Sequence, residues 1–468
     1  MKFKISILLL ILFVFTTNCD TKDDLYVPES LQINDFVWKG MNLYYLWQTD
    51  VENLRDNTFA SQDQLNTFLR SYTNPKDLFN SLKAPNSVDR FSVIFNNYET
   101  LEGILSGNTL NNGVDYGLKF KAGSITDLFG WVRYIIPNSD ASTKNIFRGS
   151  IFHAINGTPL TISNYKELLE NTTQILNLAD YDNGTITPNG NSVTLIKTNL
   201  SENPVLFSNV INQGTKKIGY LVYNGFFPNY ESQLNNAFAN LKAQQITDLV
   251  LDLRYNSGGS IATATRLASM ITGQFTNQLF AREVWNAKLQ AYWNTTNPNQ
   301  LIDNFTNTLR NGSAIASLNL TKIYVLTSKS TASASELVIN GLKPYINVIQ
   351  IGDVTTGKNV GSITLYDSPN FGKTNRSNKH KYAMQPIVLK TLNNAGFGDY
   401  ENGLQPNLLY VENLGNLGVL GNVNEPLLNT ALNQIMASGK LQPIQTSINL
   451  VDFKEANVIE NQMYTEIK

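Results

Sequence analysis

Histidine and cysteine are scarce in this chain. Its 468 residues include two histidines, His153 and His380, and one cysteine, Cys19. Neither histidine has a partner at the spacing of a zinc motif, and no second cysteine exists for a disulfide or a thiolate metal site. We therefore expect no metal site. If the chain is a hydrolase, we also expect a base other than histidine, because a Ser-His-Asp triad would have to recruit one from outside the core strands.

An excess of charge is also lacking. The chain carries 36 Lys and Arg against 37 Asp and Glu, for a formal net charge of -1. A nucleic-acid-binding domain usually carries a basic patch, so we expect no nucleic-acid partner. With 42% hydrophobic residues the composition is that of a globular protein. The length favours about three folding units.

Only one apolar run is prominent, and it lies at the N-terminus. Residues 5–15 are almost entirely apolar, which is too short for a membrane span and typical of a signal peptide. Cys19 follows at a position that suits lipid attachment. We therefore predict a lipoprotein-type signal peptide over 1–18, an acidic tether over 19–28, and an exported bacterial protein. It would be held at the outer membrane or cell surface, facing the periplasm or the exterior. An incidental cysteine in a plain signal peptide is the alternative.

Three regions follow the tether. Residues 29–100 are predicted to form a small helical unit, because apolar residues between Phe36 and Trp47 recur at three- and four-residue steps. From 204 to 440, apolar strands alternate with amphipathic helices, a pattern that predicts crossover units and an α/β core. Residues 441–468 have the composition of a polar tail or a loosely docked end.

Residues 101–203 change to short strands separated by Gly and Asn turns. Asn156-Gly157 is a tight-turn signal between two apolar runs. This order resembles a PDZ domain, although generic hairpins give similar strings. The "GLKF" stretch resembles the carboxylate-binding loop of that domain, where backbone N–H groups capture a chain terminus beside a sheet edge. The expected contacts to a substrate tail are Tyr116, Gly117, Leu118, Lys119 and Phe120, which are predicted to form a strand.

Two segments of the α/β region predict turns that could stabilise negative charge. Gly258 and Gly259 end "DLRYNSGG", at a strand-to-helix turn where glycine permits positive φ and helix-start N–H groups attract anions. Ser333 lies in "STASASE", also between a strand and a helix. Its spacing to Glu336 is that of a capping box, which alone would explain the segment. The same geometry could hold a nucleophile beside oxyanion donors.

A third segment, "TTGK", ends at Lys358 directly after a predicted strand. Most lysines in polar turns are simply solvated. A lysine buried beside a serine, however, loses the hydration of its charged form, so that its pKa falls and it can act as a base.

Together and in this order, the three segments resemble the carboxyl-terminal processing peptidases, also called tail-specific proteases. That family has a "DLRxNxGG" turn, then an "SASASE"-like serine motif, then a "TxGK" lysine motif. The interval of 25 residues between Ser333 and Lys358 agrees with the family spacing. The "GLQPN" segment at 403–407 is a further similarity, so that the resemblance spans roughly residues 116–407.

The resemblance implies a fold, a reaction and partners. The fold is a crotonase-like α/β peptidase core with a β-rich, PDZ-like domain, and no cofactor is implied. The reaction is serine endopeptidase cleavage, with Ser333 as nucleophile and Lys358 as general base. The N–H of Ala334 and that of Gly258 or Gly259 would hold the oxyanion. The partners are protein or peptide substrates recognised by their free C-termini.

One departure from the family pattern keeps an alternative open. Many members carry a glutamine four residues after the lysine, where it helps to orient the ammonium, but Ser362 stands there in this chain. Ser362 would do this less well. The alternative is a catalytically weak or inactive peptide-binding protein on the same scaffold. A crotonase-like enzyme acting on thioesters is a further alternative, which an exported location disfavours because its cofactor-linked substrates are absent there.

Overall fold

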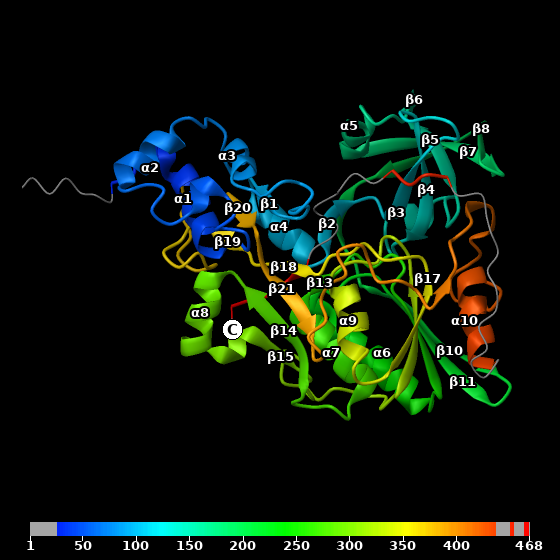
Figure 1. Ribbon diagram of the computed structural model, residues 1–468. Coiled ribbons are helices and arrows are strands. Elements are labelled where there is room, and N and C mark those ends of the chain that lie inside the picture. Colours follow the sequence, from blue (N-terminus) through cyan, green and yellow to red (C-terminus); the bar gives the residue numbers. More distant parts are fainter. Residues whose placement is uncertain (1–25, 437–449, 454–462, 468) are drawn as a thin grey trace, which may run out of the picture.

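The computed structural model describes residues 26–436, 450–453 and 463–467. Cys19, the predicted signal peptide and most of the predicted tether lie outside the described residues. Figure 1 shows a helical N-terminal unit on one side, a β-rich unit above and an α/β core below. Within the described ranges, no helix combines the length and apolar character that a membrane crossing needs.

The N-terminal unit is helical, as predicted, and packs around buried Phe36, Met41 and Tyr45. Side-chain caps start its helices: Ser61 accepts from an N–H of the next helix, and Asn74 does the same ahead of a proline. The helices are α1 (Gln32–Tyr44), α2 (Gln62–Leu69), α3 (Pro75–Ser81) and α4 (Tyr98–Leu105). A small sheet closes the unit with strands from distant sequence, in the order β1 (Val93–Phe95), β20 (Ala383–Gln385) and β19 (Leu365–Tyr366).

The β-rich unit comprises residues 108–201. Its main sheet has the order β3-β4-β5-β7-β8, so that β3 lies at an edge. Asn156 and Gly157 both have positive φ, which confirms the predicted tight turn. The elements are β2 (Asn108–Asn111), β3 (Val114–Phe120), β4 (Leu128–Ile135), β5 (Ile151–Ile155), β6 (Thr158–Pro159), α5 (Tyr165–Glu170), β7 (Thr173–Asp182), β8 (Thr185–Ile196) and β9 (Thr198–Ser201).

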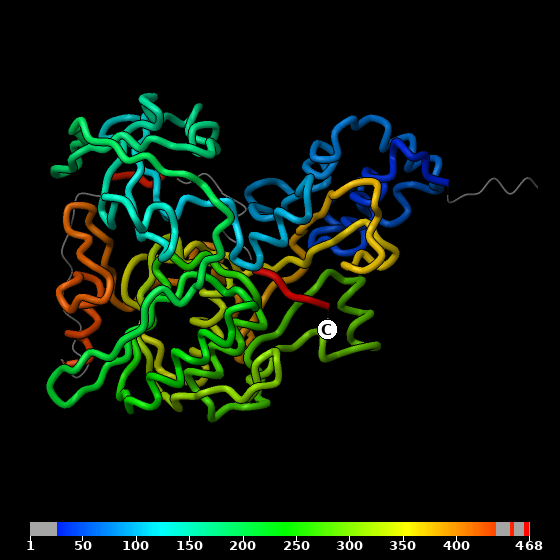
Figure 2. Tube along the Cα trace, turned by 180° about the vertical axis from the view of Figure 1, so that it is seen from behind, coloured from blue at the N-terminus to red at the C-terminus, as the bar shows by residue number. Residues whose placement is uncertain are grey.

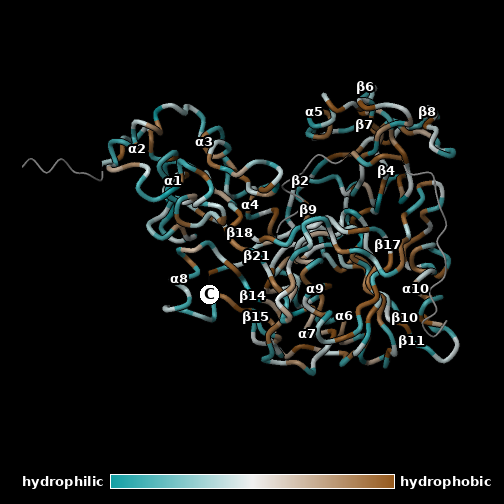
Figure 3. The backbone as a smooth tube through the Cα atoms, in the orientation of Figure 1, coloured by the Kyte–Doolittle hydropathy of each residue, from teal (hydrophilic) through white to brown (hydrophobic). Residues whose placement is uncertain are grey.

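The core contains the predicted α/β arrangement. Its first sheet has the order β10-β11-β12-β16-β17-β22, parallel except for β10. The apolar runs form buried strands, and Figure 3 shows hydrophobic stretches along this sheet with polar loops around it. The strands are β10 (Val205–Gln213), β11 (Lys216–Tyr223), β12 (Asp248–Asp252), β16 (Lys322–Thr327), β17 (Asn347–Gly352) and β22 (Leu408–Leu409). The helices are α6 (Glu231–Ala243), α7 (Ile261–Thr272), α9 (Ala334–Leu342) and, in a separate apolar cluster on the same sheet, α10 (Pro426–Met436).

A second six-stranded sheet lies beside the first. Its order is β13-β23-β18-β21-β14-β15, and most of these strands are far apart in sequence. The strands are β13 (Gly259–Ser260), β14 (Leu279–Trp285), β15 (Ile302–Asn304), β18 (Val360–Ser362), β21 (Ile387–Asn393) and β23 (Met463–Tyr464), with α8 (Ala287–Thr296) between β14 and β15. Single-turn 3-10 helices occur at Glu29–Leu31, Glu52–Leu54, Ala141–Thr143, Pro228–Tyr230, Pro298–Leu301 and Leu414–Asn416.

Two stretches bear on the predicted site. The strand predicted over residues 116–120 is confirmed: it is part of β3, and residues 117–120, compared above with a carboxylate-binding loop, each pair with β4. Within the predicted C-terminal tail, Met463 and Tyr464 form strand β23 in the second sheet of the core. Figure 2 shows this red C-terminal segment between the core and the N-terminal unit.

Candidate active site

Ser333 lies at a sharp turn between β16 and α9. Its φ of 67° is unusual for a residue other than glycine, and such strain persists only where the surroundings enforce it. Two hydrogen bonds hold the preceding loop: the Thr331 hydroxyl donates to the Leu253 carbonyl at 2.8 Å, and Ala332 N–H donates to the Asn256 carbonyl at 3.1 Å. The Ser333 side chain is buried, and among the described residues its Oγ makes no hydrogen bond of normal geometry.

A single buried carboxylate joins the serine turn to the lysine loop. Oε2 of Glu336 accepts hydrogen bonds from Ser333 N–H at 2.7 Å and from Lys358 N–H at 2.8 Å. Oε1 accepts from Gly357 N–H at 2.7 Å and from the Thr355 hydroxyl. Burial raises the pKa of Glu336, while these four donors act in the opposite direction. The Ser333 N–H bond is one half of the predicted capping box; the contacts to residues 355–358 come from tertiary structure.

Lys358 has the environment expected of a lysine base. Its side chain is fully buried, and loss of hydration lowers its pKa to about 7, although the charges of Asp89 and Glu336 partly oppose this. The Phe91 ring lies over the ammonium, with its centroid 4.6 Å from Nζ. Arg90 donates to the Gly357 carbonyl at 2.8 Å, which ties the N-terminal unit to the lysine loop.

Residues 89–92 therefore form the roof over Lys358. Oδ1 of Asp89 accepts the N–H groups of Phe91 and Ser92 at 3.0 and 2.9 Å, and its Oδ2 accepts the Tyr45 hydroxyl at 2.7 Å. These bonds fix the Phe91 ring in place. Sequence reasoning did not find this roof, because nothing in its composition marks it and it is more than 260 residues from the lysine.

The structure brings Ser333 and Lys358 to one carboxylate without joining their side chains. Within the described part of the chain, Ser333 Oγ makes no hydrogen bond of normal geometry, so it is not hydrogen-bonded to the ammonium. Their main-chain N–H groups share Glu336 Oε2, so the two residues are close neighbours. Catalytic hydrogen bonds often tighten only when substrate binds.

The expected oxyanion donors lie in two turns that are linked through Asn256, whose carbonyl accepts the Ala332 N–H at 3.1 Å. Ala334 is the first residue of α9, so its N–H has no partner within the helix. Gly259 requires glycine, since a Cβ there would lie 2.4 Å from the Phe226 carbonyl oxygen and its φ is 138°. The N–H of Gly258 donates to Asn256 Oδ1 at 2.9 Å, so it is used within the turn. Of the two glycines, Gly259 is the better candidate donor.

Ser362 is not used to orient the lysine in this structure. It is buried in β18, and its hydroxyl donates to the Met463 carbonyl at 3.1 Å. Its other close contact is Gln385 Oε1, at 3.5 Å. The hydroxyl proton is therefore engaged with the C-terminal strand.

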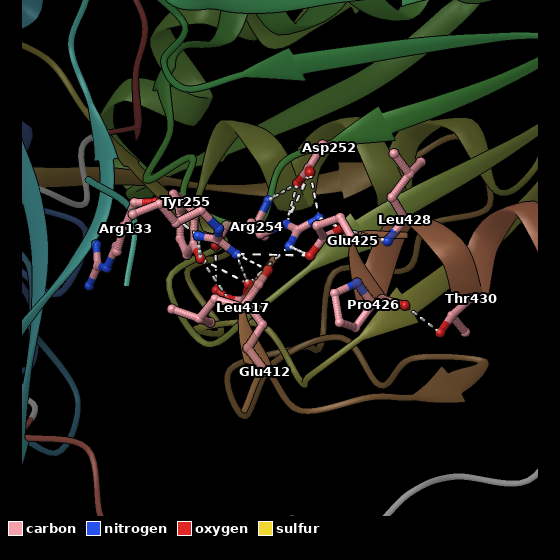
Figure 4. Close-up of polar contacts among 12 residues, drawn as sticks. Arg133, Asp252, Arg254, Tyr255, Glu412, Leu417, Glu425, Pro426, Leu428 and Thr430 are labelled. Carbon is pink, nitrogen blue, oxygen red and sulfur yellow. Dashed lines mark hydrogen bonds and ion pairs between the residues drawn. The ribbon is translucent and has the colours of Figure 1, made fainter. Parts of the chain in front are cut away.

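Asp252 and Arg254 of "DLRYNSGG" belong to a buried ion network that the sequence did not reveal. Figure 4 shows Arg254 between Asp252 and two glutamates. Its guanidinium lies 2.8 Å from Asp252, 2.9 Å from Glu412 and 2.7 Å from Glu425. A buried arginine with so many acceptors holds the strand end and the glycine turn in one position.

The network continues into the β-rich unit. Arg148 donates to Glu412 at 2.6 Å and to the Tyr255 hydroxyl at 2.5 Å. The Tyr255 ring packs against Trp131 and Tyr134 of β4. Burial would raise the pKa of Glu412, but Arg148 and Arg254 hold it at about 2. The two units are thus joined by an ionised, largely buried contact.

The histidines lie elsewhere. His380 Nε2 is 2.9 Å from Asp367, and its ring packs against Phe36. His153 is half-buried in β5, where burial lowers its pKa. Neither contributes to the arrangement around Ser333. Among the described residues, no group of three His, Cys, Asp or Glu side chains could hold a metal ion.

A strained, buried serine and a buried lysine of lowered pKa, joined by one carboxylate, define a candidate nucleophile–base pair of a covalent hydrolase. Comparison with known proteins agrees with this class. Residues 217–374 match Peptidase family S41, and residues 32–93 match the Peptidase S41 N-terminal domain. The chain therefore carries the domains of this family, which confirms its resemblance to the carboxyl-terminal processing peptidases.

Curated relatives and solved structures agree with that result. The chain is 25% identical over 236 residues to carboxyl-terminal-processing peptidase 2, chloroplastic, of Arabidopsis thaliana, covering 47% of this chain and 40% of that protein. It thus spans less than half the length of that relative. A crystal structure assigned to the S41 proteases of Bacteroides fragilis has a TM-score of 0.67 at 26% identity, covering 89% of this chain and 99% of that one. The photosystem II D1 C-terminal processing protease shares the fold, with a TM-score of 0.50 at 18% identity, over 86% of this chain and all of that one.

Proposed function

We propose that this chain is a serine endopeptidase in which Ser333 is the nucleophile and Lys358 the general base. The observation that carries the proposal is the pair of bonds from Ser333 N–H and Lys358 N–H to one Glu336 oxygen, beside a lysine whose pKa is about 7. Glu336 is a positioning residue: it fixes both main chains and does not touch the substrate.

The reaction needs only these groups. Neutral Lys358 takes the proton of the Ser333 hydroxyl as Oγ attacks a peptide carbonyl. The N–H groups of Ala334 and Gly259 hold the oxyanion, and losing one such donor typically costs about 3 kcal/mol in the transition state. The protonated lysine then gives its proton to the leaving amine. A water molecule, deprotonated by the same lysine, hydrolyses the acyl-enzyme.

The β-rich unit is proposed to be PDZ-like and the core crotonase-like. Supporting the first, β3 is an edge strand with helix α5 nearby, an arrangement that can accept an added peptide strand. Substrates would be proteins or peptides engaged through their tails. Supporting the second, parallel strands and helices alternate around Ser333.

The chain is further proposed to be an exported bacterial lipoprotein. Its apolar segment at 5–15 ends four residues before its single cysteine. Replacing Cys19 with serine is expected to abolish lipid labelling of the expressed protein. Unchanged labelling in that variant would contradict the anchor and leave the peptidase proposal untouched.

A peptide-binding protein without catalytic activity is the second candidate. It is favoured by the Ser333 hydroxyl, which is not bonded to Lys358, and by Ser362, whose hydroxyl is used elsewhere. Both candidates predict peptide binding, and only the first predicts cleavage.

Digestion of an unfolded protein decides between them. The wild type is expected to produce fragments, detected by mass spectrometry, that are absent with Ser333→Ala. Lys358→Arg is expected to be as inactive as Lys358→Ala, because guanidinium does not release its proton in this pH range. Ser330→Ala, the same change three residues earlier in the loop, is the matched control and retains cleavage. Equal fragmentation by wild type and Ser333→Ala would rule out the assignment.

A further inference from the structure

The free edge of strand β3 within its sheet is covered by another part of the chain. Residues 450–453 lie along it: Phe120 N–H donates to the Val451 carbonyl at 3.0 Å, and Phe453 N–H donates to the Leu118 carbonyl at 3.0 Å. Lys119 and Asp452 form an antiparallel bridge between the two segments. The C-terminal segment thus adds a short strand to the β-rich sheet, which is the geometry of a bound peptide.

Two side chains of this added strand fit specific positions. The Phe453 ring packs edge-on against Phe120, at 5.5 Å between centroids, and against Tyr165 of α5, at 5.0 Å. The Asp452 carboxylate lies 2.5 Å from Lys119 Nζ, and Lys119 is only 9% exposed. Val451, by contrast, is 68% exposed. The groove between β3 and α5 therefore holds an acidic residue against Lys119 and the following aromatic residue against Phe120 and Tyr165.

The same segment also touches the rim of the candidate active site. Asp452 Oδ2 lies 3.6 Å from Nζ of Lys329, in the loop that carries Ser333. A cavity of about 100 Å³ lies between β3 and this loop, and both Asp452 and Phe453 line it. The occupant thus lies between the groove and the loop that leads to the nucleophile.

Further along, the C-terminal segment pairs with the strands on both sides of the site. Met463 lies opposite Gly259, the candidate oxyanion residue, and Thr465 N–H donates to the Ser362 carbonyl at 3.0 Å. Figures 1 and 2 show the two red segments, one against the β-rich unit and one in the core. The chain's own C-terminal segment therefore contacts both the groove and the site.

We propose that the groove between β3 and α5 binds extended segments with an acidic residue followed by an aromatic one, and that residues 450–453 are its resident occupant in cis. Main-chain bonds to β3 give affinity, while Lys119 and the Phe120–Tyr165 pocket give specificity. The bound segment continues beyond Phe453, so this mode of recognition needs no free carboxylate. The idea that substrates must displace residues 450–453 rests on the proposed function. The binding site itself does not depend on that function.

A tethered occupant has a calculable effect on affinity. A short linker gives an effective concentration of roughly millimolar. A peptide that binds the empty groove at tens of micromolar is therefore weakened by roughly tenfold or more when the occupant is in place. Removing the Phe453 anchor is expected to reverse that loss.

The test measures binding, not cleavage. Fluorescence anisotropy follows a labelled peptide with the sequence of residues 448–455, blocked at both ends, on the full chain carrying Ser333→Ala. Adding Phe453→Ala to the protein is expected to tighten binding at least tenfold. Adding Val451→Ala, a truncation of the neighbouring exposed side chain, is expected to leave it unchanged.

A charge exchange checks the specificity. In the Phe453→Ala background, Lys119→Glu is expected to weaken binding of the Asp-containing peptide at least tenfold. The same change is expected to strengthen binding of a peptide with Lys in place of that Asp. Equal affinity of the Phe453→Ala and Val451→Ala proteins would overturn the resident occupant. If Lys119→Glu does not change the affinity for either peptide, the assigned specificity is overturned. Because every protein carries Ser333→Ala, neither outcome depends on whether Ser333 is the nucleophile.

Discussion

At the scale of single residues, the proposed role of Lys358 as base makes its pKa decisive. A lysine base must be neutral, so activity is expected to rise with pH through the pKa of about 7. A histidine base of ordinary pKa would give a rise near ~6.5, so the pH profile alone is weak evidence for lysine. The Phe91 roof provides a stronger test, because it keeps water from the ammonium.

Phe91→Ala is expected to move the midpoint of the pH profile to higher pH. Hydration of the charged form is partly restored, so the pKa of Lys358 moves toward the ~10.4 of free lysine. Activity at neutral pH is expected to fall roughly tenfold each time the midpoint rises by one pH unit. The measurement is kcat/KM against pH. Phe147→Ala, a change at a ring that is 64% exposed on the β-rich unit, is the control. An unshifted midpoint in Phe91→Ala would contradict Lys358 as the base.

Glu336 is the other decisive residue, and all its contacts are with donors. Each Glu336 oxygen accepts two hydrogen bonds, and Glu336→Gln replaces one of these oxygens with an NH2 group that cannot accept, so at least one main-chain N–H is left unsatisfied. We expect unfolding free energy to fall by about 1–3 kcal/mol in denaturant titrations, together with a loss of kcat. Glu99→Gln, an exposed glutamate paired with Lys381, is the control and stays within about 0.5 kcal/mol of the wild type. Wild-type kcat in Glu336→Gln would show that the carboxylate does not position the pair.

The sequence predicted some of these residues and not others, for physical reasons. Ser333 and Lys358 stand in short motifs, each next to a strand end, so local pattern was enough. The four donors of Glu336 meet only after β17 and α9 pack, so the sequence showed its capping role alone. Phe91 belongs to another unit, and no local pattern links it to Lys358.

At the scale of elements, alternation of strands and helices predicted the first sheet well, because buried parallel strands are continuous apolar runs. The second sheet was not predicted. Its strands β13, β18 and β23 have two or three residues each, and β23 pairs with β13 and β18 across 204 and 102 residues, so neither periodicity nor propensity marks them. The "GLKF" stretch was predicted to lie on a strand, and it does: Gly117 lies in β3, under the Trp131 ring.

The glycine turn before α7 gives a prediction at this scale. Gly259→Ala places a Cβ against the Phe226 carbonyl and requires alanine at a φ of 138°. The turn must shift, which misplaces the proposed oxyanion donor, so we expect a loss of roughly 100-fold or more in kcat. The strain is expected to lower unfolding free energy by about 1–3 kcal/mol.

Gly396→Ala is the matched control for that change. Gly396 also has positive φ, but its Cβ would meet nothing within 4 Å. It is expected to cost about 1 kcal/mol of unfolding free energy and to leave kcat unchanged. If both variants lose the same stability and the same activity, the close approach to Phe226 is not what the turn requires.

At the scale of the whole molecule, three units meet around one site. The N-terminal unit covers Lys358, and the core supplies the serine, the lysine and the glycine turn. The β-rich unit is joined to the core through Arg148, Tyr255 and Glu412. No sequence pattern pointed to this last contact, because Arg148 and its two partners lie more than 100 residues apart in the chain.

Arg148→Met tests whether that contact holds the β-rich unit against the core. The change keeps an apolar stem but removes one of the two cations beside Glu412, and breaking a buried pair costs about 3 kcal/mol. We expect faster proteolysis of the β-rich unit and lower unfolding free energy than for Lys144→Met, a control at an exposed lysine of the same unit. Because the folded pKa of Glu412 is about 2, below the ~4.3 of a free glutamate, its contribution is full above that higher value. It is lost as pH falls from there toward 2, so the difference between Arg148→Met and wild type should shrink over the same interval. A difference that is independent of pH through this range would mean that packing of the Arg148 stem, and not the ion pair, joins the two units.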